Sequence, residues 1–257
     1  MKTAIVNVST GKHYVKGQSR LLEAAWRHSP DSRTVTFTNT MPAGCPSHDQ
    51  VPYAMKPYAL RAAAERGADL LLWCDASILP IKSLGPLWAR IERDGYWFAN
   101  NGWSNYEWTA DGAYPDLFPT ESRVRYGVGE AASLEYARDV NRKIPHVVAT
   151  AFGLSMKSEI GRQFLAEYFR LASETKAFCG PWINSLHADS PTRVPYNKRI
   201  APCGPPDVRG HRHDQSCASV IAWRLGMKLS SPPDVFAYGK SADAHDERTI
   251  LLADGAY

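Results

Sequence analysis

Two hydrophobic patterns alternate along the first hundred residues. Short β-branched or apolar runs predict strands at residues 3–8, 34–38, 69–74 and 96–100. Apolar residues at helical spacing predict helices between them, at residues 18–28, 56–67 and 84–93. Residues 9–14, STGKHY, are expected to form a loop after the first strand. Strands that alternate with helices favour a mostly parallel central sheet flanked by helices, so the predicted fold class is α/β.

The second half of the chain is less regular. Residues 101–145 mix Gly, Asn, Asp, Pro and aromatic residues, which predicts a long insertion, and residues 176–212 are expected to form a loop. The further elements expected here are a helix at 130–143, a strand at 146–156, a helix at 158–174 capped by Ser158 and a helix at 213–226 capped by Asp214. Without repeats or low-complexity tracts, residues 1–257 are expected to form a single domain.

Composition narrows the class of protein. The formal charge of +4 and the pI near 8.7 permit an anionic ligand such as a nucleotide or nucleic acid without requiring one. Five cysteines without a CxxC pair argue against a disulfide framework and against a zinc knuckle. No window approaches the ~20 apolar residues of a membrane span, and the N-terminal apolar run is too short for a signal peptide. A cytoplasmic protein without a membrane partner is the expectation.

Asp75 directly follows the apolar run LLLWC, at the strand end where open α/β sheets bind ligands. If the chain stays extended there, alternation places Asp75 and Ser77 on the same side. A carboxylate and a hydroxyl so placed can share one hard divalent cation, with substrate phosphates completing its shell. The alternative is that Asp75 caps the next turn and Ser77 faces solvent.

The segment from Tyr53 to Asn100 resembles the central part of GT-A-type glycosyltransferases. In that family a lysine- and alanine-bearing helix leads to an apolar strand, which ends in a DXD motif that holds Mn²⁺ or Mg²⁺ and the diphosphate of a nucleotide sugar. Here the motif reads Asp75-Ala76-Ser77, with serine in place of the second acid. Three further segments, VNVSTGKHYVKG, HVVATAFGLSM with its following helix, and the "DQ" segment GHRHDQSCASVIAWRLGM, resemble other parts of the family in the expected order.

The resemblance implies a GT-A-like (Rossmann-like) fold. Residues 1–100 would form the half that binds the nucleotide sugar, and residues 101–257 the acceptor-side half. The small-residue run of HVVATAFGLSM would allow close approach of substrate to the backbone.

The resemblance also implies a donor site. Thr10 and Tyr14 would bind the base and ribose of the donor, expected to be a UDP-sugar, although a plain turn explains the two residues equally well. Lys56 would approach a phosphate, or it is a solvated lysine at a helix start. Asp214, as general base or sugar-positioning group, and Gln215 would face the sugar or acceptor.

A metal site follows from the same resemblance. Asp75 would hold Mn²⁺ or Mg²⁺, and Ser77 would assist directly or through water. The missing second acid leaves a place for a third ligand, for which His213 and His245 are the candidates.

The resemblance therefore implies a glycosyltransferase, and the expected acceptor is a hydroxyl of a carbohydrate or of a hydroxylated DNA base. Two alternatives stay open: a metal-dependent hydrolase built on His211, His213 and Asp214, and a non-catalytic module that binds a nucleotide sugar or nucleic acid. The segment 96–118 carries eight aromatic residues at neither helical nor alternating spacing. It either forms the acceptor side, where aromatic faces stack on sugars or bases, or a hydrophobic cluster under a loop.

Overall fold

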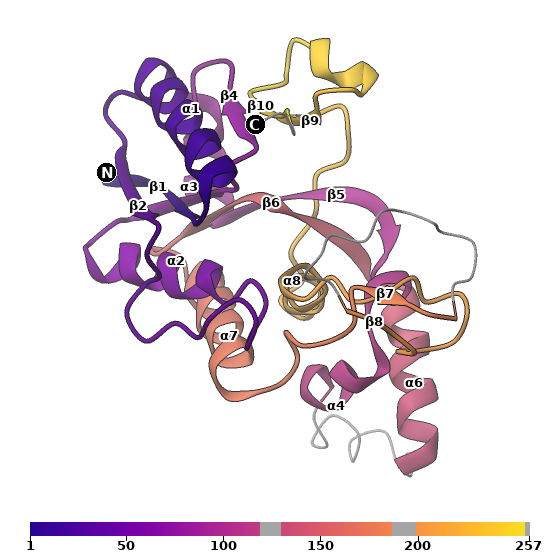
Figure 1. The fold of residues 1–257 in the computed structure, drawn as a ribbon. Coiled ribbons are helices and arrows are strands. Elements are labelled where there is room, and N and C mark those ends of the chain that lie inside the picture. The colour runs from indigo at the N-terminus through magenta and orange to yellow at the C-terminus, as the bar shows by residue number, and fades with distance from the viewer. Residues whose placement is uncertain (119–129, 187–198, 255–257) are drawn as a thin grey trace.

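The computed structural model describes residues 1–118, 130–186 and 199–254. Its centre is a five-stranded sheet of order β2-β1-β3-β6-β5 (Figure 1). These strands are β1 (Thr3–Ser9), β2 (Arg33–Thr38), β3 (Leu70–Cys74), β5 (Tyr96–Ser104) and β6 (Pro145–Ser155). β1 pairs in parallel with β2 and β3, whereas β6 is antiparallel to both of its neighbours, β3 and β5. Within this sheet β6 alone runs against the others, and the predicted mostly parallel α/β sheet is confirmed.

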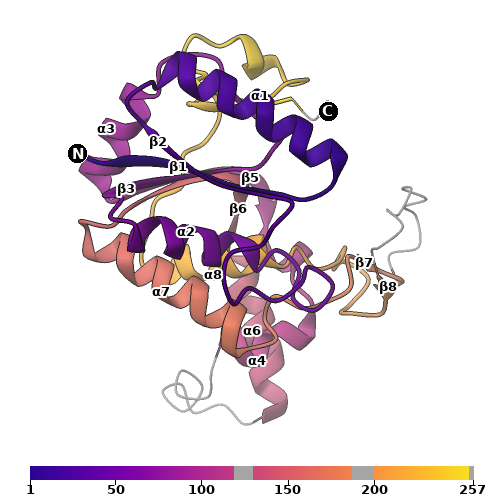
Figure 2. The same ribbon diagram turned by 60° about the vertical axis from the view of Figure 1, so that its left-hand side comes forward.

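Helices cover both faces of the sheet (Figure 2). α1 and α3 lie on one face, and α2, α7 and α8 lie on the other. The described helices are α1 (Lys12–His28), α2 (Met55–Glu65), α3 (Gly85–Asp94), α4 (Tyr114–Leu117), α6 (Glu130–Arg142), α7 (Glu159–Glu174) and α8 (Asp214–Arg224). Short strands complete the fold: β4 (Ile78–Pro80), β10 (Leu251–Ala253) and β9 (Phe236–Tyr238) in one small sheet, and β7 (Ile183–Asn184) with β8 (Ile200–Ala201) in another.

The apolar run of β3 is explained by burial on both faces. Leu70 and Leu72 pack into the core beneath α1 and α3, whereas Leu71 and Trp73 pack into the core formed with α2, α7 and α8. All four side chains are at most 1% exposed. A strand covered on both sides needs apolar residues at every position, because successive side chains point to opposite faces.

β6 follows β5 along the chain but lies between β3 and β5 in the sheet. Gly153 of β6 would place an added Cβ only 2.2 Å from Ile91 Cδ1 of α3. Gly153 therefore admits the packing of a helix on the sheet, and the expectation that the small-residue run admits substrate stays a prediction.

The predicted loop at 9–14 is wrong in its second half. Gly11 has φ 82° and ψ 153°, a region that glycine alone adopts readily. The chain turns at this residue, and α1 begins immediately at Lys12. Tyr14 consequently lies on the first turn of a helix, with 55% of its surface exposed.

No helix in the described ranges is both long and apolar enough to cross a membrane. The single-domain organisation and the cytoplasmic location stay predictions.

Candidate functional site

Asp75 lies at the carboxyl end of β3, where the sequence predicted it, but the chain turns there. The Asp75 N–H donates to the Thr150 carbonyl at 2.7 Å, and the Ile78 N–H donates back to the Asp75 carbonyl at 2.9 Å. Residues 75–78 thus form a turn, so alternation does not align Asp75 with Ser77, and that expectation is wrong. Ser77 is half-buried, and 26% of the Asp75 side chain is exposed.

Lys56 is the residue around which the site is built. Only 2% of it is exposed. Its Nζ lies 2.8 Å from Asp214 Oδ2, 3.3 Å from Asp75 Oδ1 and 2.7 Å from the Ala149 carbonyl oxygen. An ammonium has three N–H donors, so three oxygens account for all of them. We call Lys56, Asp75 and Asp214 the Lys56 cluster.

This role was not predicted from the sequence, which left Lys56 as a phosphate-binding or solvated lysine. A signal was present. Lys56 lies three and four residues before Ala59 and Leu60, both fully buried, and side chains at these spacings share one face of a helix. The lysine therefore had to project into the core unless its stem bent out to solvent.

The Lys56 cluster places one ammonium between two carboxylates. Burial lowers the pKa of Lys56, but Asp214 and Asp75 raise it further, so the net pKa is above the ordinary value. Burial raises the pKa of Asp214, and Lys56 opposes that shift. Asp214 is the first residue of α8 and His213 is its N-cap, which corrects the prediction that Asp214 caps this helix. The Asp214 carboxylate is instead committed to Lys56.

Two aromatic rings enclose the ammonium. Lys56 Nζ lies 5.4 Å from the Tyr53 ring centroid and 5.5 Å from that of Trp73. Trp73 Nε1 also donates to Asp75 Oδ1 at 2.7 Å. Asp75 Oδ1 thus has two donors, whereas no residue of the described ranges forms a hydrogen bond with Oδ2. That oxygen is the open acceptor of the cluster.

The other predicted donor-site residues, Thr10, Tyr14 and Gln215, lie outside the Lys56 cluster. Thr10 and Tyr14 are exposed at the end of β1 and the start of α1. Burial, Asp214, Asp75 and Tyr14 together raise the pKa of Tyr53, whose ring centroid lies 5.4 Å from Lys56 Nζ. Gln215 Nε2 donates to the Val147 carbonyl of β6, so its amide nitrogen is turned towards the sheet; that Gln215 faces the sugar or acceptor stays a prediction.

His211 serves the fold. Its Nδ1 accepts from the Ala110 N–H at 3.2 Å, and its Nε2 lies 2.9 Å from the Ala177 carbonyl. Both ring nitrogens are therefore engaged by the backbone in a fully buried residue. A hydrolase centre that uses His211 as a metal ligand does not fit this structure.

His213 lies in an aromatic environment. Its Nδ1 forms a hydrogen bond with the Phe178 carbonyl at 2.9 Å. In the described part of the chain, His213 is hydrogen-bonded to neither Asp75 nor Ser77. Across the described residues, no group of three or more His, Cys, Asp or Glu side chains is arranged to hold a metal. The role of His213 as third ligand stays a prediction, and the side chain of His245 lies outside the described residues.

A cavity of about 330 Å³ adjoins the cluster. The rings of Tyr53, Trp182 and His213 form part of its wall, with centroids 5.7–6.4 Å apart and interplanar angles of 25–28°. We call this cavity the aromatic pocket. It is lined by His48, Asp49, Gln50, Pro52, Tyr53, Cys179, Gly180, Trp182, Arg199 and His213.

Buried histidines predict that the protein loses stability in acid. Burial lowers the pKa of His146 to about 3, of His211 to about 4 and of His213 to about 2. The unfolded chain binds protons at these positions below about pH 6.5, so the stabilisation is complete above that pH and falls as pH drops towards the folded values. Urea unfolding between pH 7.5 and 5 should show the loss. His146→Gln should flatten the slope by up to ~1.4 kcal/mol per pH unit.

His13, which is exposed, provides the control, because His13→Gln should leave that slope unchanged. An unfolding free energy that stays constant from pH 7.5 to 5 in the unmodified protein would contradict the prediction.

No known family profile and no curated protein matches this sequence. Solved structures do resemble it. A glycosyltransferase involved in the glycosylation of the major capsid of PBCV-1 is 11% identical over 98% of this chain and 92% of its own, with a TM-score of 0.48. The WbbM bifunctional glycosyltransferase in its apo form is 8% identical with a TM-score of 0.49, and this chain, although wholly covered, spans 46% of it. Mouse xyloside xylosyltransferase 1 is 10% identical over 97% of this chain and 84% of its own, at a TM-score of 0.36. Likenesses at this level carry no argument about activity, so any functional conclusion depends on the geometry of the site.

Proposed function

We propose that this protein is a glycosyltransferase that moves a sugar from a nucleoside diphosphate, with UDP as the nucleotide, to an acceptor hydroxyl. The observation that carries the proposal is the Lys56 cluster at the carboxyl end of β3, where Asp75 Oδ2 has no hydrogen-bond partner among the described residues. Ligands of open α/β sheets bind at this edge. A buried lysine paired with carboxylates in such a position is typical of a catalytic or ligand-binding site.

Charge develops at two places in this reaction, on the leaving diphosphate and on the acceptor oxygen. The bond between the anomeric carbon and the terminal phosphate oxygen breaks, and a bond between the anomeric carbon and the acceptor oxygen forms. The nucleoside diphosphate leaves with both bonding electrons, and the proton of the acceptor hydroxyl passes to the departing diphosphate. In our proposal the Lys56 ammonium offsets the negative charge of Asp75 and Asp214 beside the leaving diphosphate. Asp214, which is 4% exposed and bonded to Lys56, holds that ammonium in place.

This assignment favours the positioning role of Asp214 over the role of general base. A base must reach the proton that it removes, and the Asp214 oxygen that contacts Lys56 is already engaged. Thr10 and Tyr14, exposed near the same edge, are the proposed contacts of the nucleoside.

The residues of this chain supply only part of a coordination shell for a divalent cation, and phosphate oxygens of the donor would supply the rest. Asp75 Oδ2 is open, and Ser77 follows in the same turn. Mg²⁺ in particular is often held by one or two carboxylates together with substrate phosphates. We therefore propose that Asp75, assisted by Ser77, holds Mn²⁺ or Mg²⁺ once the donor is bound. The cation would neutralise charge on the leaving diphosphate.

A thermal-shift panel tests the donor. Nucleoside diphosphates and their sugars should be compared with and without Mn²⁺, because a ligand that binds the native state raises the unfolding temperature. At a concentration of 100 times Kd the stabilisation is ~2.7 kcal/mol. UDP with Mn²⁺ should raise the unfolding temperature more than UDP alone, and Mn²⁺ alone should have little effect.

The proposal fails if no nucleotide shifts the unfolding temperature. Stabilisation by a nucleotide sugar without release of free sugar or transfer to any acceptor would instead support the non-catalytic binding module.

A further inference from the structure

Two arginines and three tryptophans alternate along one part of the acceptor-side half. The Arg212 guanidinium carbon lies 3.9 Å from the ring centroids of both Trp108 and Trp182. The Arg209 guanidinium carbon lies 4.5 Å from the Trp103 centroid and 5.8 Å from that of Trp108. The order is therefore Trp103, Arg209, Trp108, Arg212, Trp182, which we call the Trp–Arg ladder.

The backbone builds the ladder from three separate segments. Arg209 N–H donates to the Glu107 carbonyl at 2.7 Å, and Arg212 N–H donates to the Trp108 carbonyl at 3.0 Å. On the other side, Gly210 passes so close to Trp182 that an added Cβ would lie 2.1 Å from its carbonyl oxygen. The alternation is held by main-chain hydrogen bonds and by a glycine contact, so it does not depend on the aromatic contacts alone.

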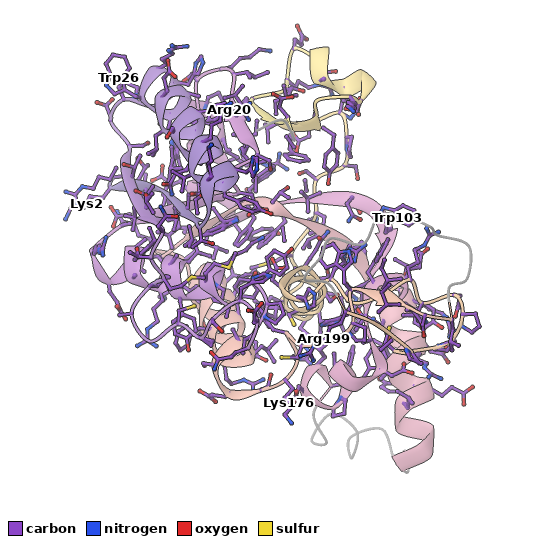
Figure 3. The ribbon with its side chains drawn as sticks, in the orientation of Figure 1. Lys2, Arg20, Trp26, Trp103, Lys176 and Arg199 are labelled. Atoms are coloured by element: carbon purple, nitrogen blue, oxygen red, sulfur yellow. The ribbon has the colours of Figure 1, made fainter. Side chains whose placement is uncertain are left out.

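The ladder leads from the surface to the candidate site. Trp103, at its outer end, is 40% exposed (Figure 3). At its inner end, Trp182 stacks on His213, whose ring stacks in turn on Tyr53 beside Lys56. A ligand that follows the ladder inward would therefore reach the aromatic pocket next to the Lys56 cluster.

The charges along this path indicate the sign of the ligand. Arg212 donates to the Trp182 carbonyl at 2.9 Å, and burial lowers its pKa to about 10. Within the described ranges no carboxylate lies within ion-pair distance of Arg212 or of Arg199 in the pocket wall. Arg209 pairs with the carboxylate of Glu107 at 3.4 Å, and 38% of its side chain is exposed. Asp49 also lines the pocket, but among the described residues it pairs with neither Arg199 nor Arg212. An anionic ligand would therefore supply the partners that these arginine charges lack.

Alternating cations and aromatic rings match one class of macromolecule best. A single-stranded nucleic acid presents a phosphate and a flat base in every residue, and proteins bind such strands with basic grooves and stacking aromatic side chains. Arginine adds cation–π contacts to the same surface. A neutral glycan would use the rings but leave the arginine charges without partners.

We propose that the Trp–Arg ladder binds a single-stranded nucleic acid and leads one of its bases into the aromatic pocket. That this strand is the acceptor of sugar transfer rests on the proposed function; that it binds does not. Phosphates would contact Arg209 and Arg212, and a base would stack on the exposed face of Trp103.

The test measures binding without any donor. A fluorescein-labelled single-stranded DNA oligonucleotide and an RNA oligonucleotide of the same sequence are titrated with the protein at increasing KCl, and the anisotropy gives Kd. Log Kd should rise linearly with log salt, by ~0.7 for each phosphate contact. Trp103→Ala should weaken binding about 5- to 150-fold, the equivalent of the loss of one stacked base. Arg209→Gln should reduce the salt slope by ~0.7.

The chain offers matched controls for both variants. Trp26 on α1 is 74% exposed and lies far from Trp103 (Figure 3), so Trp26→Ala should leave Kd unchanged. Arg61 stacks on Phe169 at 4.4 Å and pairs with Glu65, as Arg209 does with Trp103 and Glu107. Arg61→Gln should therefore leave the salt slope unchanged.

Several results would overturn the proposal. One is that neither strand binds at low salt. Another is that Trp103→Ala and Trp26→Ala have equal effects. Salt-independent binding of a neutral oligosaccharide such as maltoheptaose, lost in Trp103→Ala, would assign the ladder to glycans. Displacement of the oligonucleotide by UDP, with loss of UDP binding in Trp103→Ala, would assign it to the donor. A thermal shift with UDP but no oligonucleotide binding would leave the proposed glycosyltransferase intact.

Discussion

Replacement of Asp75 by asparagine is expected to lower the rate of sugar transfer by about 10²–10³-fold, the effect of losing one preorganised electrostatic group at a reacting centre. The amide keeps the size of the carboxylate and can still accept from Trp73 Nε1. It loses the charge that balances Lys56 and that would hold a cation. Initial rates of UDP release from the nucleotide sugar that gives the largest thermal shift measure the effect.

Asp69 gives a matched control for this experiment. It directly precedes β3, as Asp75 directly follows it, and 28% of its side chain is exposed against 26% for Asp75. Its carboxylate pairs with Lys157 at 3.6 Å, at the opposite end of the strand. Asp69→Asn should leave the rate near that of the unmodified protein. Equal rates for the Asp69 and Asp75 variants would remove Asp75 from the reaction.

Replacement of Lys56 by methionine is expected to destabilise the protein by ~3–5 kcal/mol, because it leaves the buried Asp214 carboxylate without its cation. Methionine keeps the length and apolar character of the lysine stem, so lost packing contributes little. Urea unfolding at pH 7.5 measures the change. The rate of the proposed sugar transfer should fall as well, even when it is calculated per molecule of folded protein.

A second variant separates the charge from other effects of this substitution. Asp214→Asn in the Lys56→Met background removes the unpaired charge and should recover part of the lost stability, which a double-mutant cycle reports as coupling between the two positions. Lys157→Met breaks the exposed pair with Asp69 and should cost only ~0–1 kcal/mol. If Lys56→Met were no more damaging than Lys157→Met, the Lys56 cluster would not hold the site together.

Several elements were predictable because their cause is local. The continuously apolar run of β3 signalled a strand buried on both faces. Ser158 signalled a helix start, and its side chain accepts from the Gly161 N–H in the structure. The aromatic segment 96–118 was interpreted either as the acceptor side or as a hydrophobic cluster under a loop, and the burial of its side chains favours the hydrophobic cluster for most of them. Trp97, Phe98 and Tyr114 lie in the core, whereas Trp103 is exposed.

The features that the sequence did not predict correctly, or did not predict at all, lie where distant segments meet. A strand that begins forty residues after β5 enters the sheet between β5 and β3, and no local pattern records such an insertion. The turn at 75–78 depends on the Asp75 hydrogen bond to Thr150, which lies on that same strand. His211 looked like a metal ligand in sequence, but its ring nitrogens are bonded to backbone groups about thirty and one hundred residues away.

By itself, then, the sequence determined the α/β class, the order of most elements and the place of Asp75 at the end of a buried strand, because hydrophobic periodicity and helix punctuation act over a few residues. Tertiary structure alone decided that Lys56, Asp75 and Asp214 form one cluster and that Trp103, Trp108 and Trp182 interleave with two arginines. The physical reason is that charge balance and ring stacking act over distances of 3–6 Å in space, and the residues that satisfy them lie up to 158 positions apart along the chain.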